Sequence, residues 1–229
     1  MPVRKKALED LAEKKALALE VIRRLKAEYP DAGCTLDYDH AWQLLVSVRL
    51  AAQCTDARVN IVVEELFAKY PSVAALAAAE PEDIEAIVKP CGLGHSKARD
   101  ISACMRMLRD KYDCRVPDTF EALLALPGVG RKSANLIMGD VFGKPAIVTD
   151  THCIRLCNKI GLVDGIKEPQ KVEMALWKII PPEEGSDLCH RFVMHGRAVC
   201  NARKPECEKC CLKDICRTAR EAAGQQAEP

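Results

Sequence analysis

Lys132 and Asp150 are the residues of this sequence whose types and positions are best suited to chemistry. Lys132 falls in the first turn of a helix predicted over about 131–142, where a cation opposes the helix dipole. The positive helix end and a partly dry cleft both favour the neutral amine, which is the nucleophilic form of lysine. An amine and a carboxylate around one pocket suit attack on a sugar C1′ and proton transfer during loss of a base. A solvated surface lysine and a plain helix N-cap are the alternatives for the two residues.

The segment before Lys132 reads Leu-Pro-Gly-Val-Gly-Arg over 126–131. Pro127 ends the preceding helix, and Gly128 and Gly130 permit a tight turn and the close approach of another backbone. A helix, a Gly-x-Gly turn and a second helix form a helix-hairpin-helix, whose leading amides suit a phosphate oxygen. A plain helix–helix turn would contain the same glycines. The candidate contacts to a DNA backbone are Gly128, Val129, Gly130 and Arg131.

Four cysteines near the C-terminus are spaced C-x6-C-x2-C-x5-C and can enclose a metal ion or a cluster. A zinc site usually combines two close pairs of ligands, whereas one close pair with two outlying cysteines suits a cubane better. The spacing therefore favours a [4Fe–4S] cluster and leaves zinc as the alternative. Use of the extra thiol Cys211 would change the last two spacings to x3 and x4. The preferred ligands are Cys200, Cys207, Cys210 and Cys216.

The size and composition of the chain restrict where it can act. It has 229 residues, enough for one large or two small domains, and 48% of them are apolar. Because the formal net charge is only +1, any contact with nucleic acid must come from local basic clusters. No apolar stretch is long enough for a signal peptide or a membrane span. We expect a cytoplasmic protein whose thirteen cysteines are metal ligands or buried thiols rather than disulfides.

Helical spacing of apolar residues predicts an all-α protein with no period-2 strand. Asp56, Ser96 and Asp118 are placed to cap three of the helices. The predicted helices cover 4–27, 37–53, 56–70, about 72–79, 81–88, 96–108, 118–126, about 131–142, 150–161, 168–180 and 186–199.

Residues 126–152 contain two motifs, Leu-Pro-Gly-Val-Gly-Arg-Lys-Ser-Ala and Val-Thr-Asp-Thr-His. They resemble the helix-hairpin-helix DNA glycosylases, and most closely the endonuclease III family, over a stretch from about Asp37 to Cys216. The resemblance implies a bifunctional DNA glycosylase/AP lyase of base excision repair, which removes oxidised pyrimidines and cuts 3′ to the abasic site by β-elimination. In that family the lysine matching Lys132 forms a Schiff base with C1′, and the aspartate matching Asp150 assists base loss and elimination.

The resemblance also implies an architecture of two helical lobes with a DNA-binding cleft between them. One lobe, 34–144, would hold six helices including the hairpin. The other, 1–33 with 145–229, would carry a [4Fe–4S] cluster on the loop 200–216, with the four cysteines as ligands. The catalytic lysine and aspartate would then come from different lobes.

Further residues match the family's DNA contacts. Gln53 would enter the space left by a flipped base, and Leu93 would act as an apolar wedge. Arg203 and Lys204 would face phosphates, although an ordinary solvated loop would also contain them. His152 either lines the pocket or is a satisfied, partly buried histidine. The implied partner is duplex DNA with damaged bases or abasic sites, and the expected protein is a nucleoid-associated monomer without membrane contact.

Three other functions fit parts of the sequence. An adenine glycosylase shares the fold and the cluster, but it typically adds a C-terminal recognition domain for which a chain ending at 229 has no room, and it needs no counterpart of Lys132. A non-catalytic DNA-binding iron–sulfur sensor would bind lesion DNA without cutting it. A zinc-stabilised helical binding module would contain zinc in place of iron and sulfide.

Overall fold

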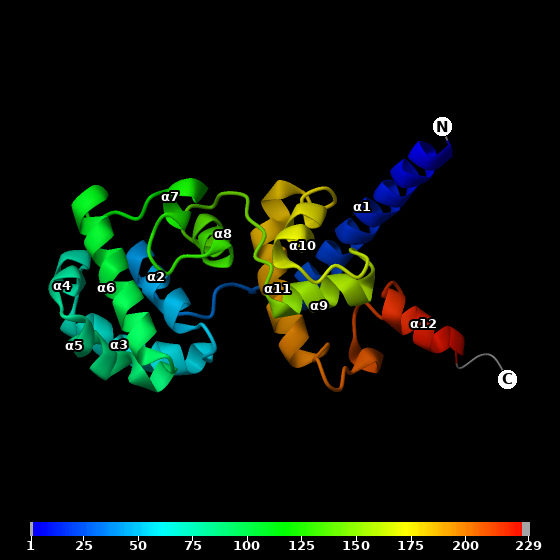
Figure 1. Ribbon diagram of the computed structural model, residues 1–229. Coiled ribbons are helices and arrows are strands. Elements are labelled where there is room, and N and C mark those ends of the chain that lie inside the picture. The colour runs from blue at the N-terminus through cyan, green and yellow to red at the C-terminus, as the bar shows by residue number, and fades with distance from the viewer. Residues whose placement is uncertain (1, 226–229) are drawn as a thin grey trace. The chain divides into compact units, whose positions relative to one another are not determined.

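The computed structural model describes residues 2–225, which form helices and connecting loops with no strand among them (Figure 1). The all-α prediction is confirmed. The chain divides into two compact units, one formed by Cys34–Lys144 and the other by Met1–Gly33 together with Pro145–Pro229. No helix of the described residues is long and apolar enough to cross a membrane.

The unit Cys34–Lys144 contains seven α-helices, one more than the six expected from the resemblance. The long α6 packs against α4 and α5, while α2 contacts α3, α6 and α8. Leu44, Leu50 and Met105 are fully buried at these contacts, and Trp42 meets Phe67 edge to face. The elements are α2 (Ala41–Leu50), α3 (Asp56–Lys69), α4 (Val73–Ala78), α5 (Pro81–Val88), the 3-10 turn η1 (Lys89–Cys91), α6 (Gly94–Lys111), α7 (Phe120–Leu124) and α8 (Arg131–Asp140).

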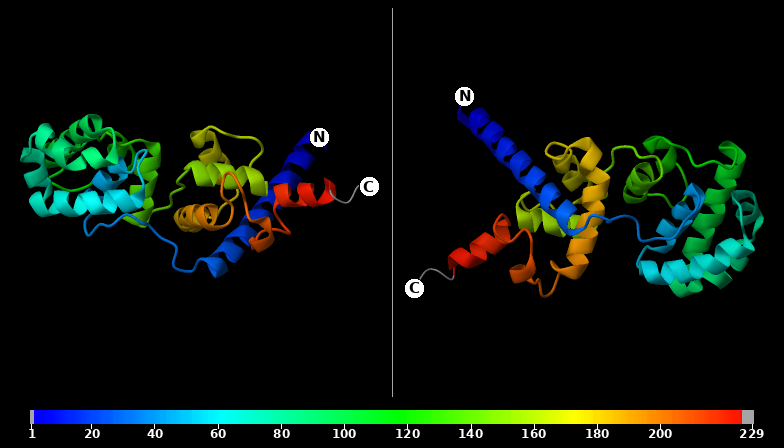
Figure 2. Two further views of the ribbon diagram at one scale, coloured as in Figure 1. Left: turned by 90° about the horizontal axis from the view of Figure 1, so that it is seen from below. Right: turned by 180° about the vertical axis from the view of Figure 1, so that it is seen from behind.

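The other unit joins the N-terminal helix to the C-terminal third of the chain. The helix α11 packs against both α1 and α9, and α12 packs against α9. An irregular segment connects α11 to α12 and is coloured orange in Figure 2. The elements are α1 (Pro2–Glu28), α9 (Thr151–Ile160), α10 (Pro169–Leu176), η2 (Pro182–Glu184), α11 (Gly185–Ala198), η3 (Cys207–Lys209) and α12 (Arg217–Gln225).

Two of the predicted N-caps are wrong by one residue. Thr55 caps α3 and Thr119 caps α7, each accepting from the amide three residues on, so Asp56 and Asp118 are not the caps. An N-cap needs an extended backbone with its side-chain oxygen turned back over the first amides, and both threonines meet that condition. Asp56 still lies in the first turn of α3, where a negative charge suits the helix dipole. Asp118 pairs with Lys144 instead.

Candidate functional site

The turn between α7 and α8 is built on Gly128. This residue has φ +75°, in the left-handed region that favours glycine. A Cβ added there would lie 2.8 Å from Asp100 Cβ and 3.1 Å from Arg49 Cδ. The hairpin turn therefore rests on side chains of α6 and α2, and only glycine permits that approach. The turn is closed by the Val129 amide, which donates to the Leu126 carbonyl at 3.1 Å.

The basic residues after the turn differ in their contacts. The Arg131 guanidinium lies 5.0 Å from the centre of the Phe120 ring, a cation–π contact that joins α8 to α7. Lys132 is exposed, whereas Ala134 and Ile137 of the same helix are fully buried. The prediction that Lys132 lies away from the apolar face of α8 is confirmed. Its amine stands in the first turn of the helix that directly follows the hairpin.

Asp150 is the N-cap of α9, as the sequence predicted. Its backbone is extended, and its Oδ1 accepts from the Cys153 amide at 2.7 Å. The segment before it is fixed by α11, because the Val148 amide donates to Cys189 Sγ at 3.2 Å. Gly185 is packed so closely that an added Cβ would lie 2.4 Å from the Ala146 carbonyl oxygen. These contacts hold the Asp150 carboxylate in one orientation at the start of α9.

Gln53 and Leu93 share an unusual backbone conformation. Both have positive φ, 57° and 51°, although neither is glycine. For an L-residue this region costs on the order of 1–2 kcal/mol, so it persists only where neighbouring contacts enforce it. Both side chains are exposed, Leu93 to 57%. Ser96 is not the cap that we predicted, because α6 already begins at Gly94; its hydroxyl accepts from Arg49 instead.

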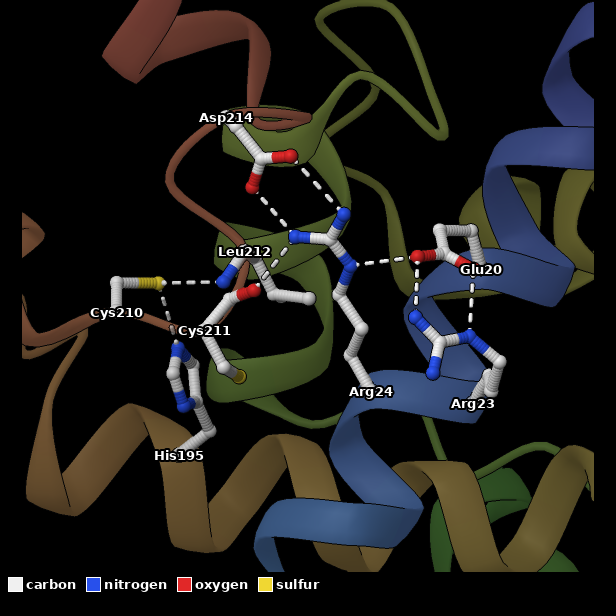
Figure 3. Close-up of polar contacts among 8 residues, drawn as sticks. All are labelled: Glu20, Arg23, Arg24, His195, Cys210, Cys211, Leu212 and Asp214. Atoms are coloured by element: carbon white, nitrogen blue, oxygen red, sulfur yellow. Dashed lines mark hydrogen bonds and ion pairs between the residues drawn. The ribbon is translucent and has the colours of Figure 1, made fainter.

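All four predicted ligand cysteines line one cavity of about 50 Å³ in the unit that contains α11. Burial raises the pKa of Cys200 and raises that of Cys210 to about 11. Cys211 is not among the residues that line this cavity. Its backbone carbonyl instead accepts from Arg24 of α1, which also pairs with Asp214 (Figure 3).

Cys210 receives two contacts from nitrogen atoms (Figure 3). The Leu212 amide donates to its sulfur at 3.4 Å, and His195 Nε2 lies 3.2 Å from the same sulfur. The Tyr29 hydroxyl lies 3.0 Å from His195 Nδ1. Burial lowers the pKa of His195, so the ring is neutral and carries one N–H. If the tyrosine hydroxyl donates to Nδ1, Nε2 carries that N–H and donates to the sulfur.

Arg155 and Gly196 of α11 lie at the start of the cysteine loop and fix its position. Arg155 Nη2 donates to the Cys200 carbonyl at 2.7 Å and to the Gly196 carbonyl at 3.2 Å. A Cβ at Gly196 would lie 2.4 Å from His152 Nδ1, so the histidine packs directly on α11. His152 also contacts Arg155 at 3.2 Å, which favours the partly buried, satisfied histidine over a pocket residue.

The donor set of this cavity limits which group it could hold. Four cysteines of one irregular segment, with a single close pair and two outlying thiols, line the same cavity. Zinc sites usually combine two close pairs, whereas this arrangement suits a group with several iron atoms. The chemistry of these residues therefore fits the [4Fe–4S] cluster that their spacing predicts.

Arg203 and Lys204 lie on the exposed part of the loop between the first two cysteines. The Lys204 amide donates to Asn201 Oδ1 at 2.7 Å, which closes the turn. This turn fixes the backbone at the two residues, whose side chains are exposed.

Comparisons with known proteins agree with this geometry. Residues 46–182 match the family described as HhH-GPD superfamily base excision DNA repair protein. Endonuclease III of Synechocystis sp. is 42% identical over 93% of this chain and 97% of its own length. Endonuclease III of Escherichia coli strain K12 is 38% identical over 88% of this chain and 95% of its own length.

The chain belongs to the endonuclease III family of this superfamily. A solved non-covalent endonuclease III–DNA complex superposes with a TM-score of 0.86 at 38% identity, covering 92% of this chain and 98% of that one. A trapped endonuclease III–DNA covalent intermediate, an estranged-adenine complex, gives a TM-score of 0.86 at 39% identity over 91% of this chain and 98% of that one. The family resemblance and the helical fold predicted from the sequence are confirmed.

For this endonuclease III relative, sequence reasoning missed the residues that hold the site residues in place. Arg155 of α9 and His195 of α11 contact the cysteine loop, and Tyr29, which directly follows α1, contacts His195. The Arg49–Asp100 ion pair, at 2.6 Å, supports the hairpin turn. The one available signal was a histidine on the helix that leads into the first ligand cysteine, and its partner Tyr29 stands far away in the sequence.

Proposed function

We propose that the chain is a bifunctional DNA glycosylase/AP lyase that removes oxidised pyrimidines from duplex DNA and cuts 3′ to the abasic site. The endonuclease III family consists of DNA glycosylases with lyase activity, and one matching structure is a trapped covalent intermediate with DNA. The observation that carries the proposal is the position of Lys132. It is an exposed amine in the first turn of α8, directly after a turn that only glycine can form.

The reaction begins when the neutral amine of Lys132 attacks C1′ of the damaged nucleotide. The C1′–N bond to Lys132 forms as the glycosidic bond breaks and the base leaves with a proton. The C1′–O4′ bond then breaks and O4′ takes up a proton, which opens the sugar ring and leaves a protonated Schiff base between Lys132 and C1′. Loss of a proton from C2′ of this Schiff base expels the 3′ phosphate, which is the β-elimination. The Asp150 carboxylate, held by the Cys153 amide, accepts and returns protons in these steps. The unit Cys34–Lys144 thus supplies the nucleophile, and the other unit supplies the carboxylate.

The residues that would contact DNA are those whose exposure and chemical groups suit phosphates or bases. The turn Gly128, Val129 and Gly130 at the positive end of α8 binds a phosphate through the amides of its two glycines, with Arg131 beside them. The Val129 amide closes the turn. Gln53 hydrogen-bonds the orphaned base edge, and Leu93 enters the stack as a wedge. Arg203 and Lys204 add positive charge opposite phosphates on the cysteine loop.

Cys200, Cys207, Cys210 and Cys216 would hold a [4Fe–4S] cluster. When bound, the cluster would order the loop that carries Arg203 and Lys204, and base removal needs no chemistry from it. The His195 and Leu212 N–H groups then donate to the thiolate of Cys210, whose deprotonation is the condition for ligation. We further propose that the protein acts as a monomer on duplex DNA in the cytoplasm, at the nucleoid.

A panel of duplexes tests the proposal, comprising an oxidised pyrimidine, uracil, an abasic site and an adenine mispair, each assayed with and without borohydride. Wild-type protein should cleave the oxidised-pyrimidine and abasic duplexes and be trapped on both as a covalent adduct. Lys132→Ala should abolish trapping, while Lys111→Ala, at an exposed lysine of α6, should leave it intact. Trapping of Lys132→Ala at the wild-type level would refute the nucleophile assignment. Binding of lesion DNA without any cleavage by wild type would favour the iron–sulfur sensor.

A further inference from the structure

Lys97 is the one charged residue that is completely buried in the unit Cys34–Lys144, with no exposed surface at all. It lies in the first turn of α6. Lysine is almost never fully buried unless its ammonium group is paired. Here the partners are two backbone carbonyls, because Lys97 Nζ donates to the Leu50 oxygen at 2.8 Å and to the Cys91 oxygen at 2.8 Å. Desolvation by burial lowers the pKa of this lysine.

Both acceptors are the last residues of helical elements. Leu50 ends α2, and Cys91 ends the 3-10 turn η1. Carbonyls at a helix C-terminus carry the partial negative charge of the dipole and lack helical partners, so a cation there satisfies and stabilises them. One ammonium group therefore caps two helix ends that are far apart in the sequence.

Each capped helix end leads directly into a residue with left-handed backbone. Gln53 follows Leu50 by three positions, and Leu93 follows Cys91 by two. These are two of the four non-glycine residues with positive φ in the described chain. Such residues need surroundings that enforce their conformation. The Lys97 contacts fix the backbone immediately before each of them.

Other contacts bring the same two loops together. Burial and, to a smaller extent, the nearby thiol of Cys54 raise the pKa of Cys91 to about 11. Cys54 directly follows Gln53 in the sequence, so this contact joins the two loops. Arg49, the residue before Leu50, pairs with Asp100 of α6 at 2.6 Å. Because Gly128 rests on Arg49 and Asp100, the hairpin turn shares this support.

We propose that Lys97 is a positioning residue that locks the loops carrying Gln53 and Leu93 at one fixed spacing, so that both enter the base stack together. This rests on the proposed function, which assigns DNA insertion to those two residues. A preformed pair of inserting side chains avoids the entropy of ordering two loops on binding. The advantage applies to the step in which a stacked base must be extruded, and less to an abasic site, where no base is present.

The test compares two substrates in single-turnover assays of Lys97→Met, which keeps the buried stem and removes the donors. Base release from a duplex with an oxidised pyrimidine should slow by about tenfold or more, because both contacts made by the charged group are lost. Strand cleavage and borohydride trapping on a preformed abasic duplex should fall by no more than about threefold, since no base is extruded. Leu93→Ala should show the same pattern.

A double-variant cycle separates positioning from general stability. If Lys97 acts through the loops, Lys97→Met with Leu93→Ala should lose hardly more base release than the stronger single variant, because both act on one step. Lys111→Met provides a matched exposed control on the same helix and should behave as wild type. Thermal unfolding of each variant is measured alongside. A Lys97→Met protein that melts like wild type and still loses base release is a result that a merely structural lysine does not give.

Three results would overturn the proposal: equal losses on the two substrates, losses that multiply in the double variant, or unchanged base release. If Lys97→Met does not fold, Lys97→Gln, which keeps a short donor, takes its place. Failure of both to fold would assign Lys97 to the core and not to the loops. Failure of the proposed function itself looks different, because wild-type protein would then neither release a base nor be trapped on any duplex.

Discussion

The two units of the chain complete their functional regions in different ways. In the unit Cys34–Lys144, the loops that carry Gln53 and Leu93 and the hairpin turn rest on contacts within the protein, from Lys97 to two carbonyls and from Arg49 to Asp100. In the other unit, helices hold the cysteine loop from outside, and four thiols of this loop line one cavity. The first region is stabilised by contacts within the protein, whereas the second is the region that we propose to hold a cofactor. The proposed reaction nevertheless uses one residue from each unit.

Asp150→Asn gives the largest expected effect and shows whether the unit that contains the cysteine loop contributes a catalytic group. Asparagine also caps helices well, so the melting temperature should hardly change. Loss of the carboxylate should slow base release by about 10²–10⁴-fold, the usual contribution of a positioned acid–base group. Single-turnover assays and thermal unfolding measure the two quantities. Asp118→Asn, at an exposed aspartate of the other unit, is the control. Unchanged turnover would reduce Asp150 to a helix cap.

Substitution of single cysteines tests whether the cavity holds the proposed cofactor. Cys210→Ser should lose most of the bound iron and sulfide, and with them much of the stability of this unit, because one of four ligands is removed. Cys211→Ser should keep the wild-type iron content, since that side chain does not line the cavity. Iron and sulfide analysis with a visible spectrum distinguishes the two. The reverse pattern would move the ligand to Cys211, and zinc in place of iron would favour the zinc-stabilised module.

Two glycine substitutions test how the hairpin turn is supported in the unit Cys34–Lys144. Gly128→Ala adds a Cβ 2.8 Å from Asp100 to a residue with φ +75°, so clash and conformation both oppose it. Gly143→Ala also has positive φ, +59°, but its Cβ would meet nothing within 4 Å. We expect a loss of about 1 kcal/mol in the free energy of unfolding for Gly143→Ala and about 2–3 kcal/mol for Gly128→Ala. Denaturant unfolding measures both. Equal losses would mean that the turn does not rest on Arg49 and Asp100 as described.

The smallest effect is expected at Asp164, which pairs with Lys14 of α1 and Arg217 of α12. Hydrogen bonds from those cations lower the pKa of the Asp164 carboxyl. Its stabilising contribution is therefore present above its unfolded pKa and is lost as the pH falls through the lower folded value. Because the carboxylate is largely exposed, Asp164→Asn should cost under about 1 kcal/mol at neutral pH. Urea unfolding at neutral and acid pH should show that the difference in the free energy of unfolding between wild type and Asp164→Asn becomes smaller as the pH falls. A difference that does not change with pH would contradict its origin in the ion pairs.

Much of the fold and of the candidate site follows from local sequence. Helical periodicity depends only on neighbouring residues, so eleven helices were located to within about four residues at each end, whereas α12 was not predicted. Gly128 and Asp150 were correctly assigned to a turn and a cap because both roles are set by backbone conformation within a few residues. The spacing of the four cysteines likewise placed them on one irregular segment. Two caps were missed by one residue because adjacent threonine and aspartate offer similar chemistry.

What only the tertiary structure decided is which side chains are buried and what they contact. Lys97 stands in Ser-Lys-Ala near the start of a helix, a sequence that is typical of an exposed position. One of the two carbonyls to which it donates is 47 positions away. His195 and Tyr29, which meet at 3.0 Å, are separated by 166 positions. The sequence alone determined the helices, the hairpin and the types of the chemical groups. Their burial and partners depend on packing between distant helices, because desolvation and hydrogen bonding at a site are summed over all the elements that surround it.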